Sequence, residues 1–266
     1  MEQAKLIWGD LELIRARAPL VHNITNYVVM NSSANALLSL GASPVMAHAI
    51  EEVEEMVGIA QALVINIGTL SEPWIRAMFA AARKARRRGI PVILDPVGAG
   101  ATALRTKTAL SLLQEAPATI IRGNASEIRS LSLSEGATKG VDSRHTAEDA
   151  LGAAQALAKL FGSVVSVSGP VDLIVGGDGV IRVANGHPLM PRVTGLGCTA
   201  SALTGAFAAV NPAPLQAAAH AMAVMGIAGE MAAEKAAGPG SLQLHFLDAL
   251  YELSYEEIAK RLRWEE

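Results

Sequence analysis

Short runs of aliphatic and β-branched residues alternate with longer amphipathic stretches from residue 20 to residue 168 of this 266-residue chain. Runs such as 62–68 and 163–168 are short for helices and are bounded by glycine or polar residues, which favours buried strands. The stretch 72–88 has its apolar residues on one helical face and is followed by Gly89, a residue that commonly ends a helix. Strands that alternate with helices in this way predict a mostly parallel sheet with helices on both faces, an α/β fold.

The remaining elements follow from the same patterns. We expect strands at 20–26, 43–46, 62–68, 90–95, 118–121 and 163–168, helices at 4–18, 27–40, 51–60, 72–88, from Thr102 or Thr106 to Gln114 and from Thr146 through Phe161, and a loop at 133–144. Residues 172–175 and 180–184 flank Gly176-Gly-Asp-Gly179, which predicts a hairpin that adds antiparallel strands at one edge of the sheet. Helices broken by prolines and glycines complete the chain, and the absence of a linker or repeat predicts one domain over residues 1–266.

Composition argues against several classes of function. Hydrophobic residues make up 51% of the chain and charged residues 18%, which indicates a large buried core. A net charge of −3 and a pI of about 6.1 give no sign of a nucleic-acid partner, and the basic run 86–88 fits a solvated helix end. We expect no membrane partner and a cytoplasmic location, because no apolar run reaches the ~18 residues of a span and no signal peptide is visible. A single cysteine excludes an internal disulfide and a zinc site built from cysteines.

The stretch from Thr194 to Ser201, Thr-Gly-Leu-Gly-Cys-Thr-Ala-Ser, combines two glycines with the start of a long helix of small residues. Gly195 and Gly197 let backbone amides face a ligand without Cβ atoms in the way. The first turn of the following helix adds free N–H groups and the positive end of the helix dipole. These features predict an anion-binding loop that suits a phosphate group.

Polar or glycine residues follow five of the predicted strands. They are Asn23-Ile-Thr-Asn26, Asn66-Ile-Gly68, Asp95-Pro-Val-Gly98, Arg122-Gly-Asn124 with Glu127, and Ser168-Gly169. Ligands of open α/β sheets bind outside the carboxyl ends of the strands. Five polar strand ends at one edge therefore predict a binding site.

Each charged residue in this set has two interpretations. Asp95 and Glu127 are placed to support Mg²⁺ near a phosphate, or else Asp95 or Asn124 caps a helix and Glu127 is the third-position partner of the cap. Arg122 fits a phosphate clamp, and the alternative is a surface arginine. Cys198 is either a small buried hydrophobe or a weak base beside the phosphate. A nucleophilic role for Cys198 would need a histidine partner, and no pattern pairs it with one.

Several stretches together resemble the hydroxyethylthiazole kinases, the thiazole-salvage enzymes of thiamine biosynthesis, which have a ribokinase-like fold. They are Val21-His-Asn-Ile-Thr-Asn-Tyr-Val-Val-Met-Asn31, Gly41-Ala-Ser-Pro-Val-Met46, Leu94-Asp-Pro-Val-Gly-Ala-Gly100, Arg122-Gly-Asn-Ala-Ser-Glu127 and Thr194-Gly-Leu-Gly-Cys198. They occur in the family's order over nearly the whole chain. The resemblance implies a three-layer ribokinase-like sandwich and ATP-dependent phosphorylation of 4-methyl-5-(2-hydroxyethyl)thiazole with Mg²⁺. It also implies a homotrimer with active sites at subunit boundaries.

The resemblance assigns roles to individual positions. Met46 and Gly195 match positions that contact the thiazole, and we expect Asn23 and Val28 to lie beside it. Arg122 and Ser168 match positions that contact ATP, with Thr194 beside them in the anion loop. Asp95 and Glu127 match the acids near Mg²⁺, and Cys198 stands where most ribokinase-like enzymes have an aspartate base. Ser168 replaces the threonine that is common in the family and keeps its hydroxyl group.

The expected mechanism places ATP across the strand ends. The amides of Gly195 to Cys198 hold the γ-phosphate and stabilise the transition state, while Cys198 accepts the substrate's proton weakly. Two alternatives stand beside this hypothesis. One is a ribokinase-like kinase of another small alcohol, such as a pyrimidine or a vitamin B6 form. The other is a nucleotide sensor that binds without turnover.

Overall fold

The computed structural model describes residues 1–134, 147–177 and 179–266. Nine strands form one sheet in the order β2-β1-β3-β4-β5-β6-β7-β8-β9. Their bounds are β1 Leu20–Ile24, β2 Ser43–Val45, β3 Ala62–Asn66, β4 Val92–Asp95, β5 Ile120–Asn124, β6 Val164–Ser168, β7 Asp172–Gly176, β8 Gly179–Val183 and β9 Trp264–Glu265. Pairing is parallel from β2 to β6 and antiparallel from β6 to β9. The predicted parallel sheet with a hairpin at one edge is confirmed.

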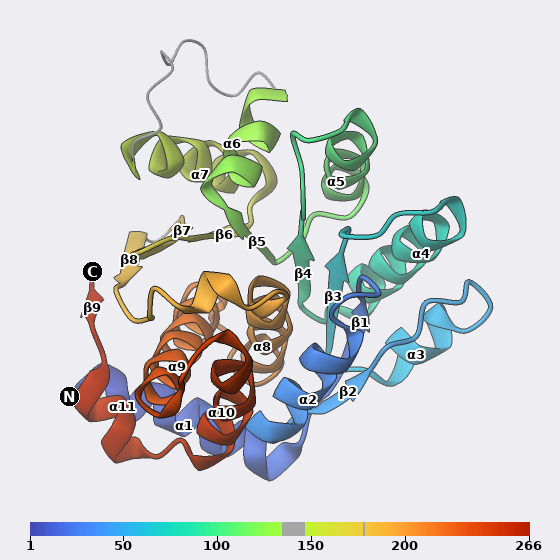
Figure 1. Ribbon diagram of the computed structural model, residues 1–266. Coiled ribbons are helices and arrows are strands. Elements are labelled where there is room, and N and C mark those ends of the chain that lie inside the picture. Colours follow the sequence, from blue (N-terminus) through green and yellow to red (C-terminus); the bar gives the residue numbers. More distant parts are fainter. Residues whose placement is uncertain (135–146, 178) are drawn as a thin grey trace.

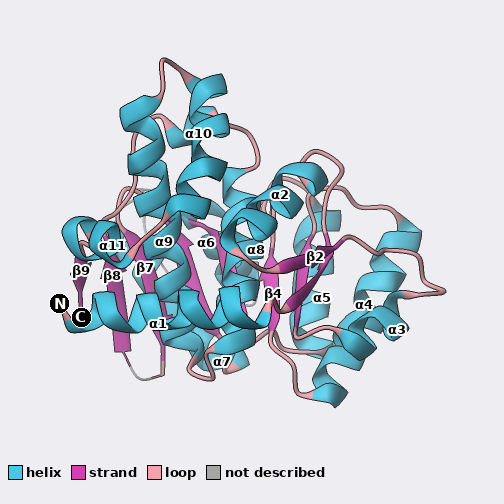
Figure 2. Ribbon diagram, turned by 90° about the horizontal axis from the view of Figure 1, so that it is seen from below, coloured by secondary structure: helices cyan, strands magenta, loops and turns pink. Residues whose placement is uncertain are grey.

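Helices cover both faces of this sheet, which gives the predicted three-layer arrangement (Figure 1). One face carries α3 Val53–Ile59, α4 Glu72–Arg88, α5 Ala103–Glu115, α6 Ala125–Ser134 and α7 Ala147–Phe161. The other carries α1 Glu2–Arg17, α2 Met30–Leu40, α8 Leu196–Val210, α9 Pro214–Lys235, α10 Pro239–Glu252 and α11 Tyr255–Arg261, with a short 3-10 helix at Met190–Arg192. Figure 2 shows the strands side by side as one sheet, with the two chain termini close together.

Several predicted boundaries need correction. The helix expected from residue 27 begins at Met30, because the side-chain oxygen of Asn26 accepts a hydrogen bond from Val28 N and holds residues 26–29 in a turn. Leu133 and Ser134 belong to the last turn of α6 instead of a loop. The rest of that predicted loop, residues 135–144, and the predicted helix start at Thr146 lie outside the described residues.

The sequence allows α5 to begin at Thr102 or at Thr106. Thr102 is the N-cap, and its hydroxyl oxygen accepts a hydrogen bond from Arg105 N at 3.3 Å. The two-residue strand β9, which pairs with β8, was not predicted.

The basic run at the end of α4 is used for tertiary contacts. The Arg88 guanidinium donates to the carbonyl oxygens of Val57 and Ala60 at 2.6 and 2.7 Å. Arg86 donates to the carbonyl of Glu115, and Arg87 pairs with Glu54. These arginines connect α4 to neighbouring elements.

Helix α8 lies close to the sheet because its core-facing residues are small. An added Cβ at Gly205 would lie 2.7 Å from Val64 Cγ2 and 3.0 Å from Val21 Cγ1. The absence of a side chain at this position therefore lets the helix backbone approach the two strands, and the loop before α8 is held against the strand ends. None of the helices in the described ranges is long and apolar enough to cross a bilayer.

This close approach gives a stability prediction. We expect Gly205→Leu to destabilise the fold by about 1–3 kcal/mol, the usual effect of overpacking a core. Gly152→Ala on α7 is the control, because nothing lies within 4 Å of its added Cβ and the better helix propensity of alanine stabilises by up to ~1 kcal/mol. Urea unfolding measures both values. A Gly205→Leu protein as stable as the parent would contradict this account of α8.

Candidate active site

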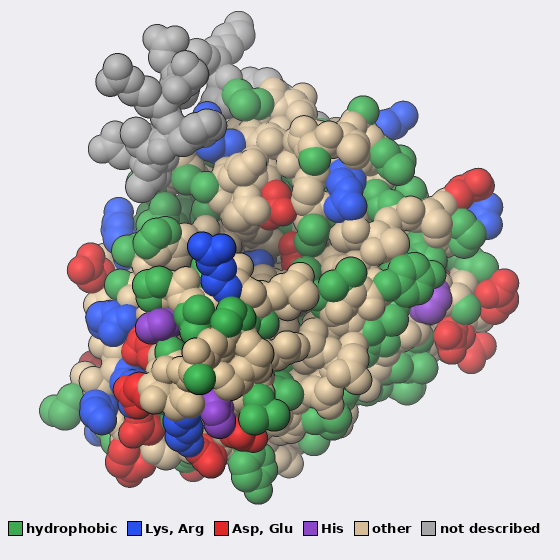
Figure 3. Space-filling model, in the orientation of Figure 1, with side chains coloured by type: hydrophobic (Ala, Val, Ile, Leu, Met, Phe, Trp, Pro, Cys, Tyr) green, Lys and Arg blue, Asp and Glu red, His purple; other side chains and the backbone are tan. Residues whose placement is uncertain are grey.

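A cleft of about 430 Å³ lies at the carboxyl ends of the parallel strands. Figure 3 shows it as a hollow between the two helical layers. Its lining residues come from the ends of β4, β5 and β6, from the loops after β1, β3 and β4, from the first turns of α5 and α6, and from the loop and first turn of α8. They are Asn26, Val28, Val29, Gly68, Asp95, Val97, Arg105, Arg122, Asn124, Glu127, Ser168, Thr194, Gly195, Gly197 and Cys198. The glycine loop and the acids after β4 and β5 therefore share one cleft.

The anion loop is built around the backbone of Gly195, the N-cap of α8. Its φ of +86° lies in the left-handed region, where glycine has no Cβ penalty. An added Cβ would also lie 2.7 Å from Val29 Cγ1. The first residues of this 15-residue helix follow directly, so their N–H groups and the helix dipole favour an anion in the cleft.

Asp95 is the buried acid of the site, with 1% of its surface exposed. Its Oδ2 accepts hydrogen bonds from Asn66 Nδ2 at 2.8 Å and from Ser201 Oγ at 2.7 Å. Burial raises the pKa of this carboxyl group to about 6 against about 3.9 in solution. Helix α5 is capped by Thr102, so the alternative in which Asp95 caps the next helix is wrong.

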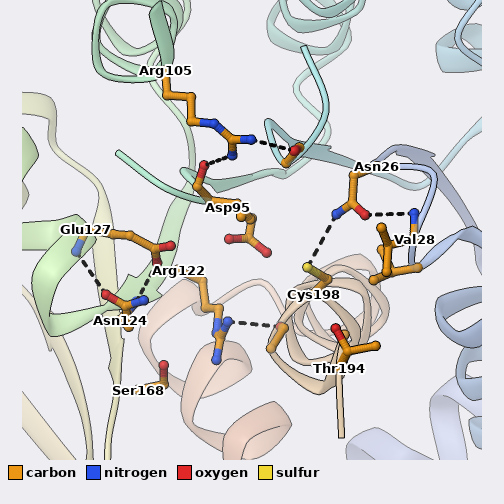
Figure 4. Close-up of a pocket in the computed structure, with 15 residues that line it drawn as sticks. Asn26, Val28, Asp95, Arg105, Arg122, Asn124, Glu127, Ser168, Thr194 and Cys198 are labelled. Carbon is orange, nitrogen blue, oxygen red and sulfur yellow. Dashed lines mark hydrogen bonds between the residues drawn. The ribbon is translucent and has the colours of Figure 1, made fainter. Parts of the chain in front are cut away.

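Glu127 is the third-position partner of a helix cap, as one of its two predicted interpretations states, and its side chain also lines the cleft. Asn124 and Glu127 exchange bonds, with Asn124 N donating to Glu127 Oε2 at 2.8 Å and Glu127 N donating to Asn124 Oδ1 at 2.9 Å. Glu127 Oε1 accepts from Gly98 N at 2.9 Å. The carboxylate is therefore fixed between β4 and β5, where Figure 4 shows it near Asp95.

These two acids fit a magnesium ion that keeps most of its water. Within the described ranges no group of three or more His, Cys, Asp and Glu side chains forms a metal cage. Mg²⁺ is usually held by one or two carboxylates together with substrate phosphates and water. Both bonds to Asp95 fall on Oδ2, and no hydrogen bond from the described residues reaches its Oδ1.

Arg122 lies beside the anion loop and is only 7% exposed, so the surface-arginine alternative is wrong. Its Nη1 donates to Gly197 O at 2.9 Å. An added Cβ at Gly197 would lie 3.1 Å from the same Nη1, so the glycine makes room for the guanidinium. Ser168, at the end of β6, donates from Oγ to Gly123 O at 3.4 Å and lines the same side of the cleft.

Cys198 lies in the first turn of α8 and faces the cleft. Its Sγ accepts a hydrogen bond from Asn26 Nδ2 at 3.5 Å. Burial, followed by the charge of Asp95, raises the pKa of the thiol to about 11. At neutral pH the sulfur is therefore a protonated thiol and a poor base.

The predicted substrate residues divide into two groups. Val28 and Gly195 line the cleft, whereas Met46 and Asn23 do not. Thr194, which we expect beside the nucleotide, also lines the cleft. Asn23 is 1% exposed, and its Nδ2 donates to Val21 O at 2.9 Å. Met46 follows the edge strand β2 and is half-buried.

Among the polar side chains that line the cleft, Asn26 and Arg105 have no individual role in the sequence-based prediction. Asn26 and Asn23 belong to the same polar strand end, and the sequence does not say which of them faces the cleft. In the structure Asn26 contacts Cys198, whereas Asn23 bonds to Val21 O within β1. Arg105 lies between the two predicted starts of a helix, Thr102 and Thr106, where an arginine carries no signal of function. Its position on the rim depends on the turn before α5.

Comparisons with known proteins agree with this geometry. The family model described as "Hydroxyethylthiazole kinase family" matches residues 11–256. The hydroxyethylthiazole kinase of Syntrophus aciditrophicus is 66% identical over 257 residues, which cover 96% of this chain and 95% of that protein. The solved structure of a hydroxyethylthiazole kinase protein from Pyrococcus horikoshii has 46% identity and a TM-score of 0.92 and covers 98% of each chain.

A more distant structure bears on the fold alone. A ribokinase-like superfamily protein from Enterococcus faecalis has 15% identity and a TM-score of 0.62, covering 87% of this chain and 86% of that one. The fold is thus ribokinase-like, as the sequence predicted. With a family model over most of its length and a relative at 66% identity, the chain belongs to the hydroxyethylthiazole kinase family.

Proposed function

We propose that this protein phosphorylates the hydroxyl group of 4-methyl-5-(2-hydroxyethyl)thiazole with ATP, to give the thiazole phosphate used in thiamine biosynthesis. The observation that carries the proposal is the shared cleft of the anion loop, Arg122 and the two acids. Phosphoryl transfer depends mainly on positioning and on stabilising charge, and this cleft supplies groups for both. Membership of the family supports the choice of substrate.

In the proposed mechanism the nucleotide lies across the strand ends. Arg122 and Ser168 bind ATP from one side, with Thr194 at the mouth of the loop. The backbone N–H groups from Gly195 to Cys198 bind the γ-phosphoryl group and stabilise the charge that develops on its oxygens. Arg122 is held beside these amides by its bond to Gly197 O.

Mg²⁺ bound in this cleft would neutralise phosphate charge, and Asp95 and Glu127 are the residues that would hold it. Asn66 and Ser201 fix the Asp95 carboxylate, while Gly98 and Asn124 fix that of Glu127. Both acids are thus oriented before a ligand arrives, which reduces the reorganisation needed during transfer.

The thiazole is proposed to bind beside Val28 and Gly195, with its hydroxyl group directed at Cys198. Asn23 and Met46 lie outside the cleft, so a direct contact from Met46 would require the ligand or a neighbouring subunit to bring it nearer. The Asn23 side chain bonds within β1, to Val21 O. The family resemblance is what favours Met46 as a thiazole contact.

A homotrimer with active sites at subunit boundaries is part of this proposal, as is a cytoplasmic location, where ATP is available. Val28, which lines the cleft, is 69% exposed, and its chain neighbour Tyr27 is 66% exposed. Exposed apolar surface of this kind suits a subunit contact. Light scattering during gel filtration tests the assembly. A monomer that is fully active would overturn this part of the proposal.

The direct test of the reaction is an assay of ADP release with ATP, Mg²⁺ and the thiazole alcohol. ADP should form with the alcohol and stay at background without it, and mass spectrometry should find the thiazole phosphate. A panel that includes a pyrimidine alcohol and pyridoxal measures selectivity. Nucleotide binding without any ADP formation would leave the protein a sensor and reject the proposal.

We expect Cys198→Ala to keep measurable kinase activity, with kcat reduced by at most ~10⁴-fold, because general-base help rarely exceeds that. The raised pKa of the thiol is the physical reason for a weak contribution. Steady-state kinetics measures the effect, and Cys198→Ser is the control that retains a small polar group. Complete loss of turnover in a folded Ala variant that binds ATP normally would contradict this.

A further inference from the structure

Four charged side chains line the cleft, and one of them has no role so far. Asp95 and Glu127 are the acids, and Arg122 lies on the side of the anion loop. Arg105 extends from the first turn of α5 and reaches the opposite side, so that Figure 4 shows the two arginines across the cleft from each other. The lining carries two positive and two negative charges.

The Arg105 guanidinium is held in place by two backbone carbonyls. Its Nη1 donates to Val97 O at 2.6 Å, and its Nη2 donates to Gly68 O at 2.8 Å. Val97 belongs to the loop after β4, which carries Asp95, and Gly68 belongs to the loop after β3. One arginine therefore ties together two of the loops that form the cleft.

The turn beside Arg105 is shaped around its guanidinium. Gly98 has a φ of +74°, in the left-handed region. An added Cβ there would lie 2.9 Å from Arg105 Nη1 and 3.1 Å from its Cδ. Glycine at position 98 thus permits both the turn and the approach of the arginine, so the guanidinium has a defined position before any ligand binds.

No acid in the described part of the chain forms an ion pair with Arg105. Among the described residues, no Asp or Glu oxygen lies within 4.0 Å of its guanidinium nitrogens. A guanidinium has five N–H donors, and two hydrogen bonds to carbonyls leave donors free. Those bonds fix the direction of the group without cancelling its charge. A half-buried, oriented and unpaired cation on a cleft wall is well suited to bind an anion.

We propose that Arg105 binds the phosphates of the nucleotide from the side opposite Arg122, a role that rests on the proposed ATP-dependent reaction. Without Arg105 the charges on the lining would sum to −1, and the cleft would repel a triphosphate. With it, the two arginines balance the two acids and contact the phosphates from both sides. The ties to Val97 and Gly68 preserve the direction of the guanidinium.

The test compares Arg105→Gln, Arg105→Lys and the parent protein by calorimetric titration with Mg²⁺ and a non-hydrolysable ATP analogue, AMP-PNP, and separately with AMP. Arg105→Gln removes the charge, and we expect it to bind AMP-PNP at least ~10-fold more weakly, about 1.4 kcal/mol, with AMP affinity changed less than twofold. The AMP-PNP affinity of Arg105→Lys should lie between those of the parent and Arg105→Gln, because lysine keeps the charge but loses the planar guanidinium. The control is Arg76→Gln on α4, an exposed arginine that pairs with Glu72 and does not line the cleft.

Two results would overturn the proposal. One is an Arg105→Gln protein that binds AMP-PNP like the parent. The other is an equal loss of AMP and AMP-PNP affinity, which a purely structural tie between the loops would produce. If Arg105→Gln does not fold, Arg105→Lys provides the test. Unchanged AMP-PNP affinity in Arg105→Lys would then reject phosphate binding by Arg105. Failure of the Arg105 proposal can be distinguished from failure of the proposed function. If the proposed function is wrong, the parent protein itself will not phosphorylate the thiazole alcohol.

Discussion

A Gly197→Val variant is expected to lose phosphoryl transfer almost completely while keeping its fold. Gly197 is exposed on the cleft, and an added Cβ there would lie 3.1 Å from Arg122 Nη1. The branched side chain of valine would displace the guanidinium and cover the amides of the anion loop. Loss of one transition-state donor typically reduces kcat by ~10²–10³-fold. Because the arginine is displaced as well, we expect kcat/KM to fall by at least ~10³-fold.

The fold should tolerate this change because the site is open and helical. Gly197 has no positive φ, in contrast to Gly195, where φ is +86° and a Cβ would lie 2.7 Å from Val29 Cγ1. A substitution at Gly195 would therefore disturb folding and binding together, whereas one at Gly197 separates them. Thermal unfolding should show a Tm within a few degrees of the parent.

Gly152→Val is the matched control, since Gly152 is also an exposed helical glycine but lies on α7, away from the cleft. Its kcat/KM should equal that of the parent protein. Normal kinetics in Gly197→Val would reject the assignment of residues 194–198 as the loop that binds the transferred phosphoryl group.

The sheet was predictable because burial on both faces leaves a strong local pattern. All five residues of β3 and all four of β4 are buried, and both strands are apolar up to the polar residue that ends them, Asn66 in β3 and Asp95 in β4. Strand β9 has only two residues and pairs with β8, about eighty residues earlier in the chain. β9 forms only because the C-terminal segment lies beside β8 in the folded chain, and no local sequence pattern predicts that position.

The site was predictable to the extent that parallel strands end at the same edge. That rule placed Asp95, Arg122, Glu127 and Ser168 in one cleft. It does not say which way each side chain turns, and so it did not distinguish Asn23, which bonds within β1, from Asn26, which reaches Cys198. Met46 came from the family resemblance alone.

Arg105 shows a different limit of sequence reasoning. Its neighbours Leu104 and Thr106 give an ordinary helix pattern, and the feature that places it on the cleft is the left-handed turn at Gly98 seven residues earlier. A contact between a helix side chain and two loop carbonyls depends on three-dimensional arrangement, so it is visible only once the fold is known.

Asp95→Asn is the second change for which we expect a large effect. Asparagine has nearly the same shape and keeps an oxygen for Asn66 or Ser201, so the fold should remain. It removes the buried negative charge that would hold Mg²⁺ near the phosphates, and kcat should fall by at least ~10³-fold, since electrostatic stabilisation dominates phosphoryl transfer. Steady-state kinetics at saturating ATP measures this, and kcat within tenfold of the parent would contradict the assignment.

The same substitution should change how stability depends on pH. The folded pKa of Asp95, about 6, lies above the unfolded value of about 3.9, so the folded protein holds this proton more tightly. The stabilisation is complete below pH 4 and is lost as the pH rises through 6. For this carboxyl group alone the free energy of unfolding should therefore be about 1 kcal/mol lower at pH 7.5 than at pH 5.

Asp95→Asn lacks that proton, so its stability relative to the parent should increase by the same amount between pH 5 and pH 7.5. Urea unfolding of the ligand-free proteins at the two pH values measures the difference. Asp172→Asn is the control, because burial also raises the pKa of Asp172 to about 6 but this residue does not line the cleft. It should show the same pH effect with a much smaller loss of kcat. Equal stability differences at both pH values for Asp95→Asn would mean that Asp95 is ionised as easily in the fold as in water, and burial would no longer explain its chemistry.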